Sequence, residues 1–109
     1  MPEIVEKIMA DLKKALKKIY ADKLKRLILF GSHARGDARS DSDVDFLVVL
    51  NEKESELNVY DEISRMNDEV YDLVLKYEIT ISVIPVSEEK YQRSIMPFIV
   101  NARNEGIAA

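Results

Sequence analysis

The sequence predicts an α/β (α+β) fold, a small mixed sheet of three to four strands that helices cover mainly on one face. Segments with helical periodicity alternate with short apolar runs, and Gly31, Gly36 and Gly106 lie where turns or ends are needed. The chain has 109 residues, 47% of them hydrophobic, which suffices for one modest core. We therefore expect a single domain over residues 1–109.

The helices are predicted from apolar residues that recur every three or four positions. This spacing predicts one amphipathic helix over residues 3–21 and a second helix over residues 55–76. A final helix begins after Ser87, a favourable N-cap residue. Pro97 is expected to break that helix before it resumes.

Three short runs predict strands. Residues 27–30 form a continuous apolar run that Gly31 ends, and residues 44–50 form a second run. From Ile79 onward apolar and polar residues alternate until Pro85, which is expected to close a third strand. This order of elements leaves one face of the sheet uncovered and places a polar motif between the first two strands.

Composition and charge exclude several classes of protein. The net charge of −4 and the pI near 5.0 argue against strong nucleic-acid binding, which depends on basic surfaces. The absence of cysteine excludes disulfides and thiolate sites, and the single His33 excludes a zinc site built from histidines. No apolar stretch approaches the roughly 20 residues that span a membrane, and no signal-peptide pattern opens the chain. We expect a soluble cytoplasmic protein.

Two aspartates are the main feature of the motif. Asp43 and Asp45 begin the second predicted strand, whose alternation places both side chains on one face while Val44 and Phe46 turn to the interior. Two carboxylates held this close repel each other, and a shared proton or a bound divalent cation relieves the repulsion. A phosphate-binding turn nearby favours the cation.

Gly31 and Ser32 supply that turn. Gly31 can adopt backbone angles closed to other residues, and Ser32 begins a short helix whose unpaired amides suit phosphate oxygens. Arg35 adds positive charge or anchors the loop. These residues predict a site for a Mg²⁺-bound nucleoside triphosphate, where attack on the α-phosphorus releases pyrophosphate.

The motif resembles the nucleotidyltransferase superfamily that includes DNA polymerase beta and kanamycin nucleotidyltransferase, and in particular its minimal nucleotidyltransferase (MNT) branch. The matching segments are Gly31-Ser32-His33-Ala34-Arg35-Gly36 and Ser42-Asp43-Val44-Asp45. MNT proteins are about as long as this chain, so the resemblance extends over most of it.

The resemblance implies a role for each part of the motif. Gly31 and Ser32 are expected to bind the triphosphate, and Arg35 and Gly36 to shape the nucleotide-binding loop. Asp43 and Asp45 are expected to bind the Mg²⁺ ions and to be the catalytic residues. The resemblance also implies a partner, a helical HEPN toxin, because characterised MNT antitoxins transfer AMP from ATP to a tyrosine of such a toxin, as in type VII toxin–antitoxin pairs.

One departure from the family pattern concerns a third acid. Family enzymes usually carry another carboxylate on the next strand, where this sequence has Ser82. Glu78 shares the face of Ser82 by alternation but lies roughly 13 Å from it along the strand, at about 3.3 Å per residue. Either catalysis proceeds with two acids and water, or the chain binds nucleotide or partner without efficient turnover.

Other polar and aromatic residues have simpler interpretations. We expect His33 to be a loop residue without a chemical role, and Asp37 and Asp41 to be solvated loop acids. The lysines at positions 13, 14, 17 and 18 are expected to form a solvated helix face. The tyrosines of the later helices are expected to pack in the core or in an interface: Tyr60, Tyr71, Tyr77 and Tyr91.

Three functions stay open from the sequence. The first is a Mg²⁺-dependent transfer of AMP to a partner protein, and the second is a catalytically weak module that neutralises its partner by forming a complex. The third is transfer to a small molecule such as an aminoglycoside, for which a chain of this length needs a second copy to complete the pocket. A homo-oligomer or hetero-oligomer is compatible with each.

Overall fold

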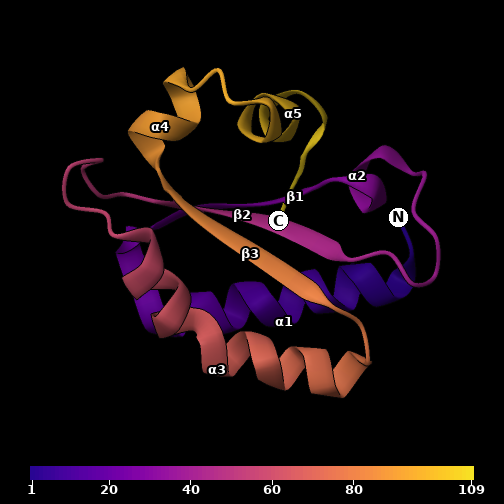
Figure 1. Ribbon diagram of the computed structural model, residues 1–109. Helices are drawn as coiled ribbons and strands as arrows, with labels where there is room; N and C mark the ends of the chain where they lie inside the picture. The colour runs from indigo at the N-terminus through magenta and orange to yellow at the C-terminus, as the bar shows by residue number, and fades with distance from the viewer.

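The computed structural model describes residues 1–109 and confirms the predicted order of elements (Figure 1). No helix combines the length and the apolar character that crossing a membrane requires. The elements are α1 (Glu3–Tyr20), η1 (Ala21–Lys23), β1 (Leu24–Phe30), α2 (Ser32–Arg35), β2 (Val44–Leu50), α3 (Val59–Tyr77), β3 (Ile81–Ser87), α4 (Glu88–Arg93), α5 (Pro97–Glu105) and β4 (Ile107–Ala108).

A mixed four-stranded sheet with the order β3-β2-β1-β4 forms the centre of the fold. β2 is antiparallel to β1 and parallel to β3, and the short β4 is antiparallel to β1. Within this register Asp45 of β2 lies between Phe30 of β1 and Ser82 of β3. The predicted fold class, a small mixed sheet covered by helices, is confirmed.

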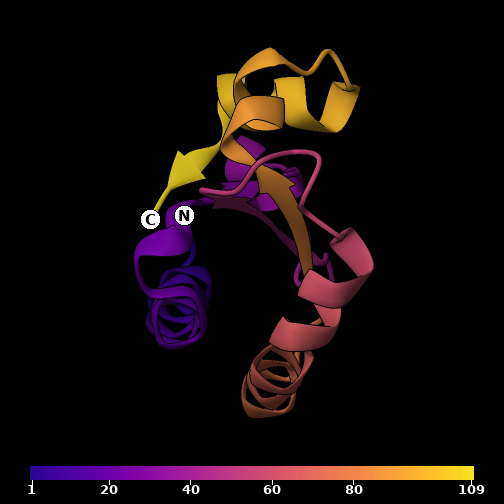
Figure 2. The ribbon, with the colours of Figure 1, turned by 90° about the vertical axis from the view of Figure 1, so that its left-hand side faces the viewer.

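Alternation along β2 sends its side chains into two separate cores. Phe46 and Val48 belong to the larger core under α1 and α3, whereas Leu47 and Val49 belong to the smaller core under α4 and α5. Figure 2 shows the sheet between these two layers of helices. The prediction that one face is uncovered is therefore wrong, because Ile99 of α5 packs on it.

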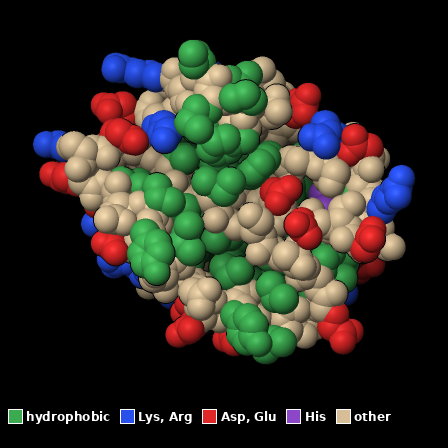
Figure 3. Space-filling view, viewed as in Figure 1, with side chains coloured by type: hydrophobic (Ala, Val, Ile, Leu, Met, Phe, Trp, Pro, Cys, Tyr) green, Lys and Arg blue, Asp and Glu red, His purple; other side chains and the backbone are tan.

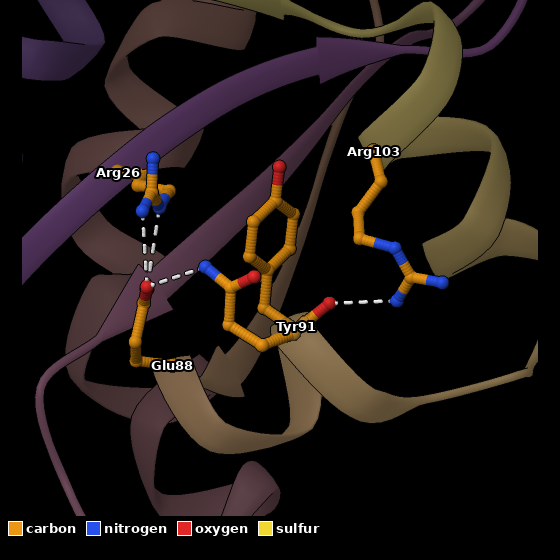
Figure 4. Close-up of polar contacts among 5 residues, drawn as sticks. Arg26, Glu88, Tyr91 and Arg103 are labelled. Carbon is orange, nitrogen blue, oxygen red and sulfur yellow. Dashed lines mark hydrogen bonds and ion pairs between the residues drawn. The ribbon is translucent and has the colours of Figure 1, made fainter.

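Polar contacts attach α4 and α5 to the sheet and to each other (Figure 4). Arg26 of β1 donates two hydrogen bonds to the carboxylate of Glu88, at 3.0 and 3.3 Å, and its guanidinium lies 5.4 Å from the centre of the Tyr91 ring. Arg103 of α5 donates to the carbonyl oxygens of Tyr91 and Ser94 at 2.7 and 2.8 Å. The two helices therefore form one layer over the second sheet face.

Two local predictions are wrong. β3 continues through Pro85, which is tolerated because β3 is an edge strand and a proline lacks only the N–H on its open side. α3 begins at Val59 rather than near residue 55, with Asn58 accepting a hydrogen bond as the N-cap. Tyr60 and Tyr71 are 80% and 59% exposed, so of the two environments expected for them only an interface stays open.

The predictions for the end of the chain are confirmed. Ser87 caps α4, because its hydroxyl accepts a hydrogen bond of 3.0 Å from the amide of Lys90. The helical segment is interrupted after Arg93, and α5 begins at Pro97, where a missing N–H costs nothing.

Candidate active site

Gly31 joins β1 to the single turn of α2 and lies against Asp45. Its φ of +79° is in the region that favours glycine. The amides of Ala34 and Arg35 both donate to the Gly31 carbonyl at 3.1 Å, so α2 begins directly after it. A Cβ atom on Gly31 would lie 2.6 Å from the Oδ2 atom of Asp45. The absent side chain is therefore what lets the loop approach the aspartate.

The two aspartates are close enough to influence each other. Asp45 is half-buried in β2, whose bounds match the predicted residues 44–50, whereas Asp43 is exposed and lies directly before the strand. Burial raises the pKa of Asp45, the charge of Asp43 raises it further, and the charges of His33 and Arg35 act in the opposite direction. The pair thus carries the mutual repulsion that a cation would relieve.

The donor set of this pair fits a magnesium ion. Carboxylate oxygens are hard ligands of the kind that Mg²⁺ prefers, and Mg²⁺ commonly takes one or two protein carboxylates together with substrate phosphates. Asp43 and Asp45 are the residues that would hold the ion, with the start of α2 beside them for the phosphates. The first amides of a helix have no partner within the helix and can donate to such oxygens.

No third acid joins the pair. Ser82 is the residue of β3 in register with Asp45, and no group of three or more acidic or histidine side chains converges anywhere in the structure. Glu78 lies in the turn after α3 with a φ of +54°, so the strand alternation expected for it does not apply. Glu78 instead lines a hollow of about 450 Å³ together with Tyr77 and Ile79.

His33 has a role that the sequence did not reveal. It lies in α2 and is only 6% exposed, and its Nε2 atom is 3.2 Å from the carbonyl oxygen of Ser42. The carbonyl can only accept, so Nε2 carries the hydrogen and donates it. His33 therefore ties the phosphate-loop candidate to the residue before Asp43. A lone histidine inside a turn motif contains no signal for such a contact nine residues away.

The remaining loop residues keep α2 short. Arg35 pairs with Asp37 at 3.3 Å and is exposed, as Asp37 and Asp41 are. Gly36 has a φ of +84° and donates from its amide to the Ser32 carbonyl at 3.0 Å, but a Cβ there would meet open space. Gly36 thus ends the helix without touching the aspartates.

Residues 9–103 match the nucleotidyltransferase domain family, and that span contains the complete motif. The chain belongs to this family. Two relatives from Methanocaldococcus jannaschii carry the provisional name protein adenylyltransferase. MJ0604 is 35% identical over 102 residues and covers 93% of each chain. MJ0141 is 38% identical over 112 residues, covering 96% of this chain and 97% of the relative.

Solved structures share the nucleotidyltransferase fold. A toxin–antitoxin complex with AMP-PNP aligns with a TM-score of 0.65 at 16% identity, covering 92% of this chain and 70% of that chain. A structure provisionally described as a minimal nucleotidyltransferase aligns with a TM-score of 0.55 at 24% identity, covering 94% and 93%. At these identities the likeness concerns the fold alone.

Proposed function

We propose that this nucleotidyltransferase is a Mg²⁺-dependent protein adenylyltransferase, which transfers AMP from ATP to a tyrosine of a HEPN-type toxin and so acts as its antitoxin. The observation that carries the proposal is the contact between loop and acids: Gly31 lies against Asp45, and Asp43 lies close enough to repel it. The provisional name of the two archaeal relatives supports a protein as the acceptor, and the complex that shares the fold is a toxin–antitoxin pair. The HEPN-type toxin and its tyrosine are what the resemblance of the motif implies.

The chemistry of this transfer is a substitution at the α-phosphorus. The acceptor oxygen forms a bond to that phosphorus, the bond to the oxygen bridging the β-phosphate breaks, and pyrophosphate leaves. Bound Mg²⁺ would neutralise charge on the phosphates. Because Ser82 replaces a carboxylate beside Asp45, the proton of the acceptor hydroxyl passes to water.

The test uses ATP labelled at the α-phosphate, Mg²⁺ and, as acceptor, a HEPN-type toxin from the same source. We expect the label to appear on that protein, whereas ATP labelled at the γ-phosphate should leave it unlabelled. Asp43→Asn should abolish labelling because it removes one carboxylate of the pair. Asp41→Asn is the matched control, since Asp41 is an exposed acid of the same loop. Absence of label with Mg²⁺ and Mn²⁺ alike would refute the transfer.

A second function is favoured by the serine in register with Asp45. A chain without the third acid can neutralise its partner by binding alone. In that case Asp43→Asn/Asp45→Asn retains full affinity for the partner in calorimetry and protects cells from the toxin as well as the unchanged protein does. If transfer is the function, Ser82→Asp should instead increase the labelling rate, because it places a proton acceptor beside Asp45.

A further inference from the structure

α3 is apolar on two opposite sides. Met66 and Leu73 face the core and are buried, as an amphipathic helix requires. On the opposite side Tyr60, Tyr71 and Leu75 are 80%, 59% and 60% exposed. Their spacing of eleven and four residues places all three on one stripe of the helix surface. Monomeric proteins seldom expose such a stripe unless it contacts a partner.

The position of the stripe follows from the contacts of α3 with α1. Glu62 accepts a hydrogen bond of 2.7 Å from Tyr20, and Lys76 donates one of 3.0 Å to Asp11, so these positions of α3 face α1. At 100° per residue, Ile63 then lies on the side away from α1, where β3 forms the open edge of the sheet. Ile63 is therefore the residue nearest the edge strand that neighbours Asp45, and the stripe begins beside it, on the surface of α3 that faces away from the core.

Apolar side chains continue beyond α3 on this side of the molecule. Figure 3 shows them from α3 across the β3 edge to the region of α4 and α5. Ile95 and Met96, in the link between α4 and α5, are 90% and 43% exposed. Tyr60 and Tyr71 alone would bury roughly 200 to 350 Å². A stable interface needs about 800 Å² per partner, so a partner must also cover side chains around the two tyrosines.

The flank of the stripe nearer α1 is acidic. Asp61, Asp68 and Asp72 follow one another along it, all exposed and without an ion pair. Arg65, on the same flank, pairs with Glu62 instead, at 3.8 Å. A second copy of the chain would bring more aspartates against this row, and an anionic membrane would be repelled by it. A basic protein surface complements it.

We propose that this surface, here the α3 face (Tyr60, Ile63, Tyr71 and Leu75 with the flanking Asp61, Asp68 and Asp72), docks the acceptor protein. The fitting partner surface is apolar at its centre and carries Lys or Arg where it meets the aspartates. Asp45 shares the sheet face of Leu47 and Val49, opposite α3, so a partner docked here reaches the site by extending around the open β3 edge. The inference rests on the proposed function, because it takes the acceptor of AMP as the occupant.

The test compares binding and labelling of the same HEPN-type acceptor. Tyr71→Asp/Leu75→Asp should weaken binding about tenfold or more in calorimetry, because buried aromatic residues dominate interfaces. Labelling should fall with it, while affinity for Mg²⁺ and an ATP analogue stays unchanged. Ala10→Asp/Lys17→Asp, at exposed positions of α1 that line no hollow with α3, adds two aspartates elsewhere and should leave both readouts as they were. Added salt should weaken the binding of the unchanged protein.

The outcomes separate the two proposals. An Asp43→Asn variant that binds the acceptor but does not label it supports both proposals. If the unchanged protein binds but never labels, and the α3-face variant loses binding, transfer is refuted and the docking face stands. If the α3-face variant binds and labels normally, only the docking face is refuted, and the transfer proposal stands. The docking face is also refuted if the unchanged protein does not bind the acceptor. The same holds if the unchanged protein binds anionic vesicles and the α3-face variant does not.

Discussion

Gly31 and Gly36 enclose the single turn of α2, and both have positive φ angles, yet only Gly31 contacts the acidic pair. The sequence predicted both glycines and both aspartates of the motif because their spacing is local. The sequence did not predict the contact of His33 with Ser42. This contact joins residues nine positions apart across an irregular loop, and hydrophobic periodicity does not describe the path of such a loop. The bounds predicted for the second strand, residues 44–50, match β2, with Asp43 directly before it.

Gly31→Ala and Gly36→Ala compare a glycine that contacts Asp45 with one that does not. Gly36 is left-handed, so its replacement costs about 1–2 kcal/mol of strain, whereas Gly31, with a ψ of −157°, is in a region that almost only glycine adopts and its replacement costs more. Only Gly31→Ala also displaces the Asp45 carboxylate, so its affinity for Mg²⁺ and an ATP analogue should fall about tenfold or more in calorimetry. Equal affinity losses in the two variants would mean that strain, not the carboxylate, controls the site.

His33→Gln and His33→Leu test whether the buried histidine positions the loop before Asp43. Glutamine retains an N–H donor near the place of Nε2, whereas leucine fills the space without one. We expect His33→Leu to need about tenfold more Mg²⁺ for half-maximal nucleotide binding, as for other partners that orient metal ligands. His33→Gln should restore much of that affinity, and identical behaviour of the two variants would reduce the role of His33 to packing.

At the scale of elements, the helices were easier to predict than the sheet faces they cover. Periodicity identifies the buried side of α1 and α3, but it does not say which face of the sheet receives α4 and α5. That choice depends on contacts far apart in sequence, such as the pairing of Arg26 with Glu88 (Figure 4). For the tyrosines of α3 the sequence left two environments open, because an apolar position on a helix fits a core and an interface equally well.

Arg26→Gln tests the attachment of α4 to β1. The Arg26 guanidinium holds the pKa of Glu88 below its usual range, so the pair stabilises the fold above about pH 4.3 and loses this effect as pH falls through the folded pKa. At pH 7 the variant should lose about 0.5–1 kcal/mol, a modest value because both side chains are partly exposed.

Chemical denaturation at several pH values measures this effect. The stability difference between Arg26→Gln and the unchanged protein should shrink below about pH 4. Lys17→Gln, an exposed lysine without an ion pair, should match the unchanged protein at every pH. A difference that grows on acidification would show that the carboxylate of Glu88 is not the group involved.

At the scale of the whole molecule, the sheet separates two cores, and the candidate site lies at the end of β2 between them. The raised pKa of Asp45 reflects burial and repulsion that the fold imposes on the unliganded pair. A ligand that relieves the repulsion should therefore stabilise the entire protein, because binding to the folded state alone shifts the unfolding equilibrium.

Thermal unfolding with Mg²⁺ and an ATP analogue together should show this stabilisation. At a ligand concentration a hundred times the dissociation constant the gain is about 2.7 kcal/mol. The analogue without Mg²⁺ should have a much smaller effect, and Asp45→Asn should remove the dependence on Mg²⁺. An equal shift with and without Mg²⁺ would exclude the acidic pair as its binding site.

The sequence by itself determined the fold class, the order of elements and the motif from Gly31 to Asp45, because periodicity, turn residues and spacing act over short stretches of chain. The strand register confirms Ser82 at the position beside Asp45. Only the tertiary structure decided that His33 anchors Ser42 and that α3 shows Tyr60 and Tyr71 to solvent. These features depend on strand register and on which side of each helix meets the sheet. Both are set by packing between segments that lie far apart in the chain.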